Sequence, residues 1–81
     1  MKMNNAKSNI LIVDDEPNVI SSLKRVFRKE PYRIHSVEDA LKAMEMLNTY
    51  PIKVIISDEK MPGVLGSEFL AVVARTFPNV V

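Results

Sequence analysis

The sequence contains no cysteine, no tryptophan and a single histidine, His35. Without cysteine the chain forms no disulfide and offers no thiolate to a metal, and one histidine alone does not build a zinc site. Its charges nearly balance, with 11 Lys and Arg against 10 Asp and Glu and a net charge of +1. This balance argues against the strongly basic surface with which a domain binds nucleic acid directly.

Long apolar runs and an apolar leader are also missing. No run approaches the ~20 residues that a helix needs to cross a bilayer. The first nine residues, MKMNNAKSN, are polar and lack the apolar centre of a signal peptide. We therefore expect a soluble, cytoplasmic protein with no membrane partner, in which residues 1–8 form a disordered or frayed N-terminal tail.

The chain does contain short apolar segments that have the character of β-strands. Asn9–Val13 and Lys53–Ser57 are nearly continuous runs rich in β-branched side chains, which is typical of strands buried on both faces of a parallel sheet. Tyr32–His35 alternates between polar and apolar residues, which favours a strand near the sheet edge. Val80–Val81 is expected to open a fourth strand.

Three helices are predicted between these strands. The first follows Pro17 in its first turn, the second has Ser36 as N-cap with Asp39 three residues on, and the third follows Gly66–Ser67. Asp58–Leu65 is expected to be a loop. Each helix has one apolar face at helical spacing. The predicted faces are Val19, Ile20, Leu23, Val26 and Phe27; Ala40, Leu41, Met44 and Leu47; and Phe69, Leu70, Val73, Ala74 and Phe77.

The order of elements is therefore β-α-β-α-β-α, followed by the start of another strand. Helices that alternate with strands through short links are typical of parallel βαβ units, and right-handed crossovers favour a doubly wound open sheet. The predicted fold class is α/β with one domain, because a chain of 81 residues builds a single core.

Three aspartates follow two of the predicted strands at their carboxyl ends. Asp14 and Asp15 come after the first strand and Asp58 after the third. Ligands of an open parallel sheet bind at this edge, so the carboxylates meet if the two strands are neighbours. Such oxygen ligands suit Mg²⁺. Taken alone, Asp58 is better explained as a solvated strand end, and Asp14 and Asp15 also suit helix capping, which is compatible with metal binding.

Further positions match these aspartates in a recurring pattern. Met61–Pro62–Gly63 follows Asp58, Gly66 precedes Glu68–Phe69–Leu70, and Asp39–Ala40–Leu41 opens the second helix. Together with the aspartates, they make the chain resemble the receiver domain of two-component response regulators from about Asn9 to its end. The resemblance implies a flavodoxin-like sheet with strand order 2-1-3 and a partial receiver domain over residues 9–81.

The resemblance also implies a phosphoacceptor switch rather than an enzyme. Asp58 would accept a phosphoryl group from a sensor histidine kinase or a phosphotransfer protein. Asp15 would bind Mg²⁺ directly and Asp14 largely through water, joined by Asp58 and the backbone carbonyl of Lys60. Carboxylates act as nucleophiles, and phosphoryl transfer depends mainly on positioning and charge neutralisation.

Two partners of the phosphoryl group in this family lie beyond Val81. They are a Ser or Thr after the fourth strand and a Lys after the fifth. We therefore expect a truncated domain in which phosphotransfer is impaired. Its third strand becomes an edge, which favours a homodimer through strand pairing or swapping.

Other functions remain open on sequence grounds. A Mg²⁺-dependent phosphohydrolase of the haloacid-dehalogenase type also uses an Asp at a strand end, but it has a D-x-D motif where this chain has Asp58–Glu59–Lys60. A pseudo-receiver would act in assembly without phosphorylation, although the intact acids argue against it. A dinucleotide-binding domain is disfavoured because DDEP, rather than a glycine-rich loop, follows the first strand.

Overall fold

The computed structural model describes residues 8–61 and 63–81. Residues 1–7 of the expected tail and Pro62 of the Met61–Pro62–Gly63 motif lie outside the described part of the chain. The main strands form one parallel sheet in the order β2-β1-β3: β1 (Ser8–Val13), β2 (Tyr32–Val37) and β3 (Ile52–Ser57). Helices alternate with them, as predicted: α1 (Pro17–Val26), α2 (Ala40–Thr49) and α3 (Gly66–Thr76).

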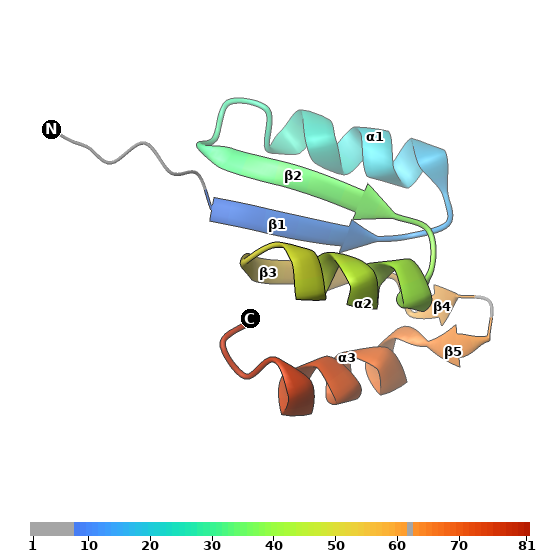
Figure 1. Cartoon of the computed structure of the whole chain (residues 1–81). Helices are drawn as coiled ribbons and strands as arrows, with labels where there is room; N and C mark the ends of the chain where they lie inside the picture. Colours follow the sequence, from blue (N-terminus) through green and yellow to red (C-terminus); the bar gives the residue numbers. More distant parts are fainter. Residues whose placement is uncertain (1–7, 62) are drawn as a thin grey trace, which may run out of the picture.

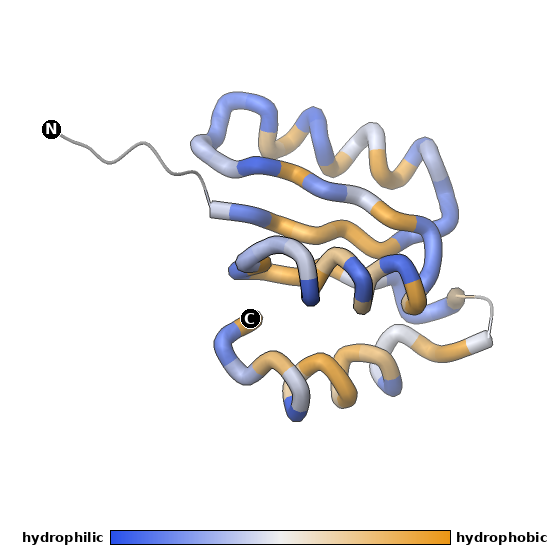
Figure 2. The backbone as a smooth tube through the Cα atoms, in the orientation of Figure 1, coloured by the Kyte–Doolittle hydropathy of each residue, from blue (hydrophilic) through white to orange (hydrophobic). Residues whose placement is uncertain are grey.

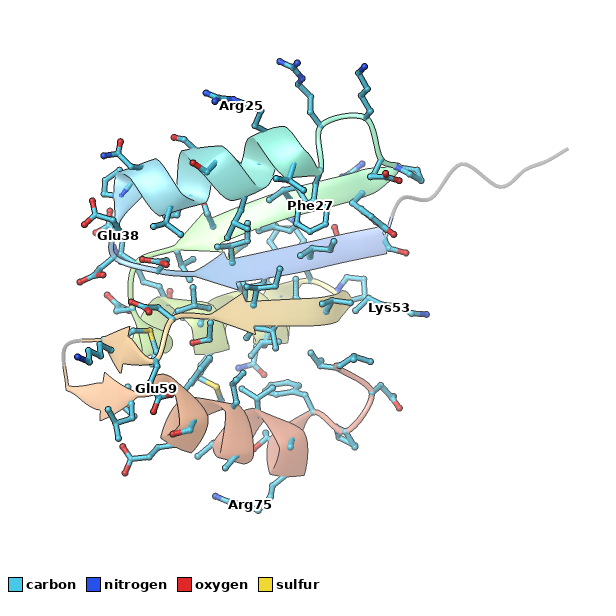
Figure 3. The ribbon with its side chains drawn as sticks, turned by 180° about the vertical axis from the view of Figure 1, so that it is seen from behind. Arg25, Phe27, Glu38, Lys53, Glu59 and Arg75 are labelled. Atoms are coloured by element: carbon cyan, nitrogen blue, oxygen red, sulfur yellow. The ribbon has the colours of Figure 1, made fainter. Side chains whose placement is uncertain are left out.

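The helices cover the two faces of the sheet unequally. Seen from one side, α2 lies in front of β3 (Figure 1), and seen from behind, α1 lies in front of β2 (Figure 3). α3 follows α2 on the first face, because both crossovers run in the same direction across the sheet. The α/β fold class and the doubly wound parallel sheet are therefore confirmed.

The core lies between β1 and the helices α2 and α3. The β1 residues Leu11, Ile12 and Val13 are completely buried, and the unbroken apolar stretch along this strand is visible in Figure 2. β1 pairs with β2 on one side and β3 on the other, so it is the central strand and has no free edge. On the side of α2 and α3, Leu11 and Val13 join a cluster with Ala43, Leu47, Ile52, Met61, Phe69 and Val73.

The apolar face predicted for α1 is not buried. None of its residues is buried, and Val19 and Val26 are 40% and 70% exposed. The reason is that α1 is the one helix of the described chain on its face of the sheet. The helix ends at Val26, and the Phe27 ring meets Tyr32 edge to face, with ring centroids 5.9 Å apart.

The start and the buried face of α2 also differ from the prediction. Ser36 does not cap the helix, because it lies within β2 opposite Ile12. Asp39 is the N-cap, and its carboxylate accepts a hydrogen bond of 2.8 Å from the Lys42 amide. Leu41, predicted on the apolar face, is 73% exposed. The face toward the core has Ala43 and Leu47 buried, with Ala40 and Met44 packed against the cluster, so the prediction was right for Leu47, Ala40 and Met44 and wrong for Leu41.

The segment Asp58–Leu65 is not only a loop. Two short strands, β4 (Lys60–Met61) and β5 (Val64–Leu65), form an antiparallel hairpin within it, and Gly63 in its turn has a φ of 87°. In α3, Phe69 and Val73 are buried as predicted, whereas Ala74 is exposed.

The C-terminal end lies beside β3. The Val81 amide donates to the Lys53 carbonyl at 2.9 Å, and the Ile55 amide donates to the Val81 carbonyl at 3.1 Å. These two bonds are those of a parallel neighbour, so the expected fourth strand begins next to β3. Ser8, which we placed in the frayed tail, instead opens β1 opposite Tyr32. No helix in residues 8–61 and 63–81 has the length and apolarity to cross a membrane.

Candidate functional site

The three aspartates singled out in the sequence come together at the carboxyl edge of the sheet. β1 and β3 are parallel neighbours whose last paired residues are Val13 and Ser57, so the residues that follow leave the sheet at the same level. Asp14, Asp15 and Asp58 each offer a carboxylate oxygen, and these oxygens all lie within 4.8 Å of one another. The adjacency of the two strands thus brings together residues from distant parts of the sequence.

Asp14 is the most constrained of the three aspartates. Its side chain is only 7% exposed, and its backbone amide donates to the Val37 carbonyl of β2 at 3.0 Å. One carboxylate oxygen, Oδ1, accepts a 2.9 Å hydrogen bond from the Glu16 amide. Because Glu16 is the N-cap residue of α1, Asp14 shapes the turn that leads into the helix while remaining part of the acidic cluster.

The other two aspartates are open to solvent to different degrees. The Asp58 amide donates to the Val13 carbonyl at 2.9 Å, which extends the pairing of β3 with β1 and fixes the backbone of Asp58. Its side chain is half-buried, whereas that of Asp15 is exposed. The cluster is therefore buried at Asp14 and open to solvent at Asp15.

Lys60 lies two residues beyond Asp58, in β4 and opposite Leu65. Its side chain is exposed. The metal-binding role of its backbone carbonyl stays a prediction. The acidic cluster of the described chain itself consists of the three aspartates.

The contact between α3 and the backbone of Asp58 explains why residue 66 is a glycine. The Gly66 amide donates to the Glu59 carbonyl at 2.7 Å. A β-carbon built on Gly66 would collide with the Asp58 carbonyl oxygen and would lie 2.9 Å from the Asp58 carbonyl carbon. Only glycine permits this approach, so α3 begins directly against the residue that follows β3.

Sequence reasoning missed Glu59. Its two carboxylate oxygens accept hydrogen bonds from the amide and the hydroxyl of Ser67, at 2.8 and 3.0 Å. Figure 3 shows this side chain between the end of β3 and the first turn of α3. No local spacing rule pairs residues eight positions apart through a hairpin, so the sequence carried no signal for this contact.

The cluster has the donor set of a hard-cation site. Three carboxylates within 4.8 Å repel one another unless a cation is bound between them. Oxygen ligands suit Mg²⁺ or Ca²⁺, whereas zinc sites use histidine or cysteine. The residues present therefore fit a hard divalent cation.

Two cavities lie away from this cluster. One of about 480 Å³ separates the ends of α2 and α3 and is lined by Leu47, Tyr50 and Phe77 among others. Another of about 400 Å³ lies beside α1, lined by Phe27, Val54 and Ile56 among others. Neither is lined by an aspartate.

Comparison with known proteins identifies the family. The profile of the response regulator receiver domain matches residues 10–81. The chain belongs to this family. Receiver domains are the signalling switches of two-component systems rather than typical enzymes, and their acidic pocket is the feature that the three aspartates reproduce.

Curated relatives of this receiver domain include a transcriptional regulatory protein and a phosphotransferase. The hydrogenase transcriptional regulatory protein HoxA of Cupriavidus necator is 35% identical over 79 residues, which are 98% of this chain and 16% of HoxA. Sporulation initiation phosphotransferase F of Bacillus subtilis is 34% identical over 61 residues, which are 75% of this chain and 49% of that protein. The chain thus spans less than half the length of both relatives.

Solved structures agree with the receiver fold. The signal receiver domain of an HD domain-containing protein from Pseudomonas fluorescens Pf-5 has a TM-score of 0.91 over 100% of this chain and 60% of its own, with 23% identity. That likeness concerns the fold alone. A crystal structure of the histidine kinase ThkA in complex with the response regulator TrrA matches with a TM-score of 0.82 and 30% identity, over 90% of this chain and 63% of that chain.

Proposed function

We propose that this receiver domain is a cytoplasmic phosphoacceptor module and that Asp58 accepts a phosphoryl group from a sensor histidine kinase or a phosphotransfer protein. The observation that carries the proposal is the convergence of Asp14, Asp15 and Asp58 within 4.8 Å at the end of β1 and β3. The kinase–regulator complex among the similar structures supports a kinase as the partner.

The proposed reaction uses Asp58 as a nucleophile. A carboxylate oxygen attacks the phosphorus of a phosphohistidine, the phosphorus–nitrogen bond breaks, and an acyl phosphate forms on Asp58 while the imidazole leaves and takes up a proton. The chain takes part in no other covalent step, so it contributes mainly by positioning the reacting groups. The bond from the Asp58 amide to Val13 holds the nucleophile at the mouth of the cluster, next to Asp15.

The proposed cofactor is Mg²⁺, with Asp14, Asp15, Asp58 and the backbone carbonyl of Lys60 as the residues that hold it. When bound, it neutralises charge between the anionic acceptor and the anionic donor. The Glu16 amide orients the buried Asp14 carboxylate at the base of the site, at 2.9 Å. Asp15 and Asp58 remain accessible from solvent.

Phosphorylation by a small donor tests the proposal. Acetyl phosphate with Mg²⁺ is expected to add no more than one phosphoryl group to the protein, slowly because phosphotransfer is expected to be impaired in this chain, and intact-mass spectrometry follows the addition. Asp58→Asn should abolish the addition, since the amide is a far weaker nucleophile than the carboxylate. Glu38→Gln removes an exposed carboxylate at the same end of the sheet and should leave the addition unchanged.

Other outcomes would contradict the phosphoacceptor role. Equal phosphorylation of Asp58→Asn would place the reaction elsewhere. Repeated turnover of phosphate esters would instead point to a phosphohydrolase, and a complete absence of phosphorylation would point to a pseudo-receiver.

We also propose that the 81-residue chain self-associates. Val81 covers β3 only at Lys53 and Ile55, and the cavity lined by Val54 and Ile56 leaves apolar surface open beside α1. An exposed strand edge next to apolar surface favours pairing with a second copy.

A further inference from the structure

The N-terminus of α3 lacks an N-cap side chain that accepts hydrogen bonds from its first turn. Its N-cap residue is Leu65, which makes no side-chain capping bond. The first amides of a helix have no partner within the helix, and a Ser, Thr, Asp or Asn at the N-cap position normally accepts one of their hydrogen bonds. The Glu68 carboxylate accepts a hydrogen bond of 3.1 Å from the Leu65 amide, but it leaves the amides of Gly66 and Ser67 to acceptors outside the helix.

Glu59 supplies this cap from the far side of the β4–β5 hairpin. Its carboxylate accepts from the Ser67 amide at 2.8 Å and from the Ser67 hydroxyl at 3.0 Å, and its backbone carbonyl accepts from the Gly66 amide at 2.7 Å. Three hydrogen bonds thus join one residue to the first turn of α3. The negative charge also lies at the positive end of the helix dipole, where it is favoured.

Glu59 lies between the two residues that the proposed function requires on this segment. Asp58 precedes it and Lys60 follows it. The carboxylate of Glu59 is directed at Ser67, and the acidic cluster of the described chain consists of Asp14, Asp15 and Asp58 without it. A fourth acid next to the site is therefore engaged by the helix and lies outside the cluster of aspartates.

We propose that Glu59 is a positioning residue: its bonds to Ser67 fix the backbone from Asp58 to Lys60 against α3, so that the carboxylate of Asp58 and the carbonyl of Lys60 are held for Mg²⁺. The inference rests on the proposed function, in which Asp58 and Lys60 bind Mg²⁺. The contact of Gly66 with the Asp58 backbone supports it independently, because a shift at the start of α3 is transmitted directly to Asp58.

Two substitutions at Glu59 distinguish the effect of its hydrogen bonds from the effect of its charge. Glu59→Ala removes both the charge and the acceptors. Glu59→Gln removes the same charge, but its carbonyl can still accept from the Ser67 amide and its NH₂ group can still donate to the Ser67 hydroxyl oxygen. The difference between the two variants therefore measures positioning alone. Glu38→Ala is the matched control, since Glu38 is an exposed acid at the end of β2 (Figure 3).

The experiment measures two quantities on the whole chain without any phosphodonor. In Mg²⁺-free buffer, hydrogen exchange of the Ser67 amide should be about tenfold faster in Glu59→Ala, the effect of losing a charge-assisted hydrogen bond. In a Mg²⁺ titration followed by NMR shifts of the Asp58 and Lys60 amides, Glu59→Ala should bind about tenfold more weakly, as is usual when an orienting partner is lost. Glu59→Gln should recover most of both effects, and Glu38→Ala should resemble the wild type.

Several results would overturn the inference. If Glu59→Ala and Glu59→Gln bind Mg²⁺ with equal affinity, only the charge of Glu59 matters and its hydrogen bonds to Ser67 do not position the site. Faster Ser67 exchange in Glu59→Ala with unchanged Mg²⁺ affinity would mean that Glu59 only caps the helix. If the wild-type chain shows no saturable response to Mg²⁺, there is no metal site for Glu59 to position. If the wild type binds Mg²⁺ but is not phosphorylated, the proposed function fails and the positioning role stands.

Discussion

Asp14, Asp15 and Asp58 have the same side-chain chemistry, and their surroundings distinguish them. Asp14 is 7% exposed and hydrogen-bonded to the turn behind it, which suits a residue that organises the base of a site. Asp15 is exposed, and Asp58 is half-buried on a backbone fixed by β1. The three residue types and their strand-end positions were readable in the sequence. Their unequal burial was not, because it depends on how β2 and α1 enclose the end of β1.

His35 provides a pH-dependent contribution to stability. Its Nε2 lies 3.0 Å from Asn9 Oδ1, and its ring stacks on Tyr50 with centroids 4.6 Å apart. Burial, and secondarily the nearby positive charge of Arg33, lower the pKa of His35 below its usual value of 6.5. The unfolded chain therefore takes up a proton at a higher pH than the folded chain does.

The free energy of unfolding should consequently fall as the pH decreases. The contribution of neutral His35 is fully present above its unfolded pKa of about 6.5 and declines as the pH falls through that value toward the lower folded pKa. Urea unfolding at a series of pH values between about 8 and 5 measures the decline. His35→Gln should remove most of it, and an unchanged slope in that variant would contradict the assignment.

The strands were more predictable than the helix faces. Ile10 to Val13 are all buried, so a continuous apolar run sufficed to identify β1. In α2, Leu47 is buried and Ala40 and Met44 pack against the core as predicted, but Leu41 is exposed and Ala43 takes its place, because spacing alone does not fix the rotation of the helix. Likewise, the hairpin of β4 and β5 has only two residues in each strand, too few for an alternating pattern.

A pair of substitutions in α2 tests which stripe faces the core. Leu47 is 6% exposed and Leu41 is 73% exposed. Leu47→Ala should lower the free energy of unfolding by about 2–5 kcal/mol, because it leaves a cavity. Leu41→Ala should change it by no more than about 0.5 kcal/mol. Urea denaturation of both variants gives the comparison, and similar losses would mean that the helix is rotated from the observed orientation.

The arrangement of the whole sheet creates the acidic cluster. Asp58 meets Asp14 only because β3 lies next to β1, in the order β2-β1-β3. Alternation of helices and strands predicted a parallel sheet, but this strand order came from the family resemblance. The contacts of Gly66 and Glu59 with α3 were beyond prediction, because they depend on how the β4–β5 hairpin folds back on the end of β3.

Self-association of the 81-residue chain is expected from the unequal cover of the sheet. α1 contains no buried residue, and Val26 is 70% exposed. Apolar surface near β3 and α1 should pair with a second copy, so sedimentation velocity should give a mass that rises with protein concentration. A single monomeric species from micromolar to millimolar concentration would contradict this prediction, and the receiver fold would be unaffected.

The central position of β1 has a consequence for which parts of the protein open together. Asp14 and Asp15 continue directly from the strand that is hydrogen-bonded on both sides and completely buried at Leu11, Ile12 and Val13, whereas α1 holds the sheet by partly exposed side chains. Local opening begins where buried contacts are fewest. When α1 detaches, the Asp14 and Asp58 backbones can stay bonded to Val37 and Val13, while the Asp14 carboxylate loses its hydrogen bond from Glu16. Opening of the surface helix is therefore expected to loosen one side chain of the acidic site and leave its backbone in place.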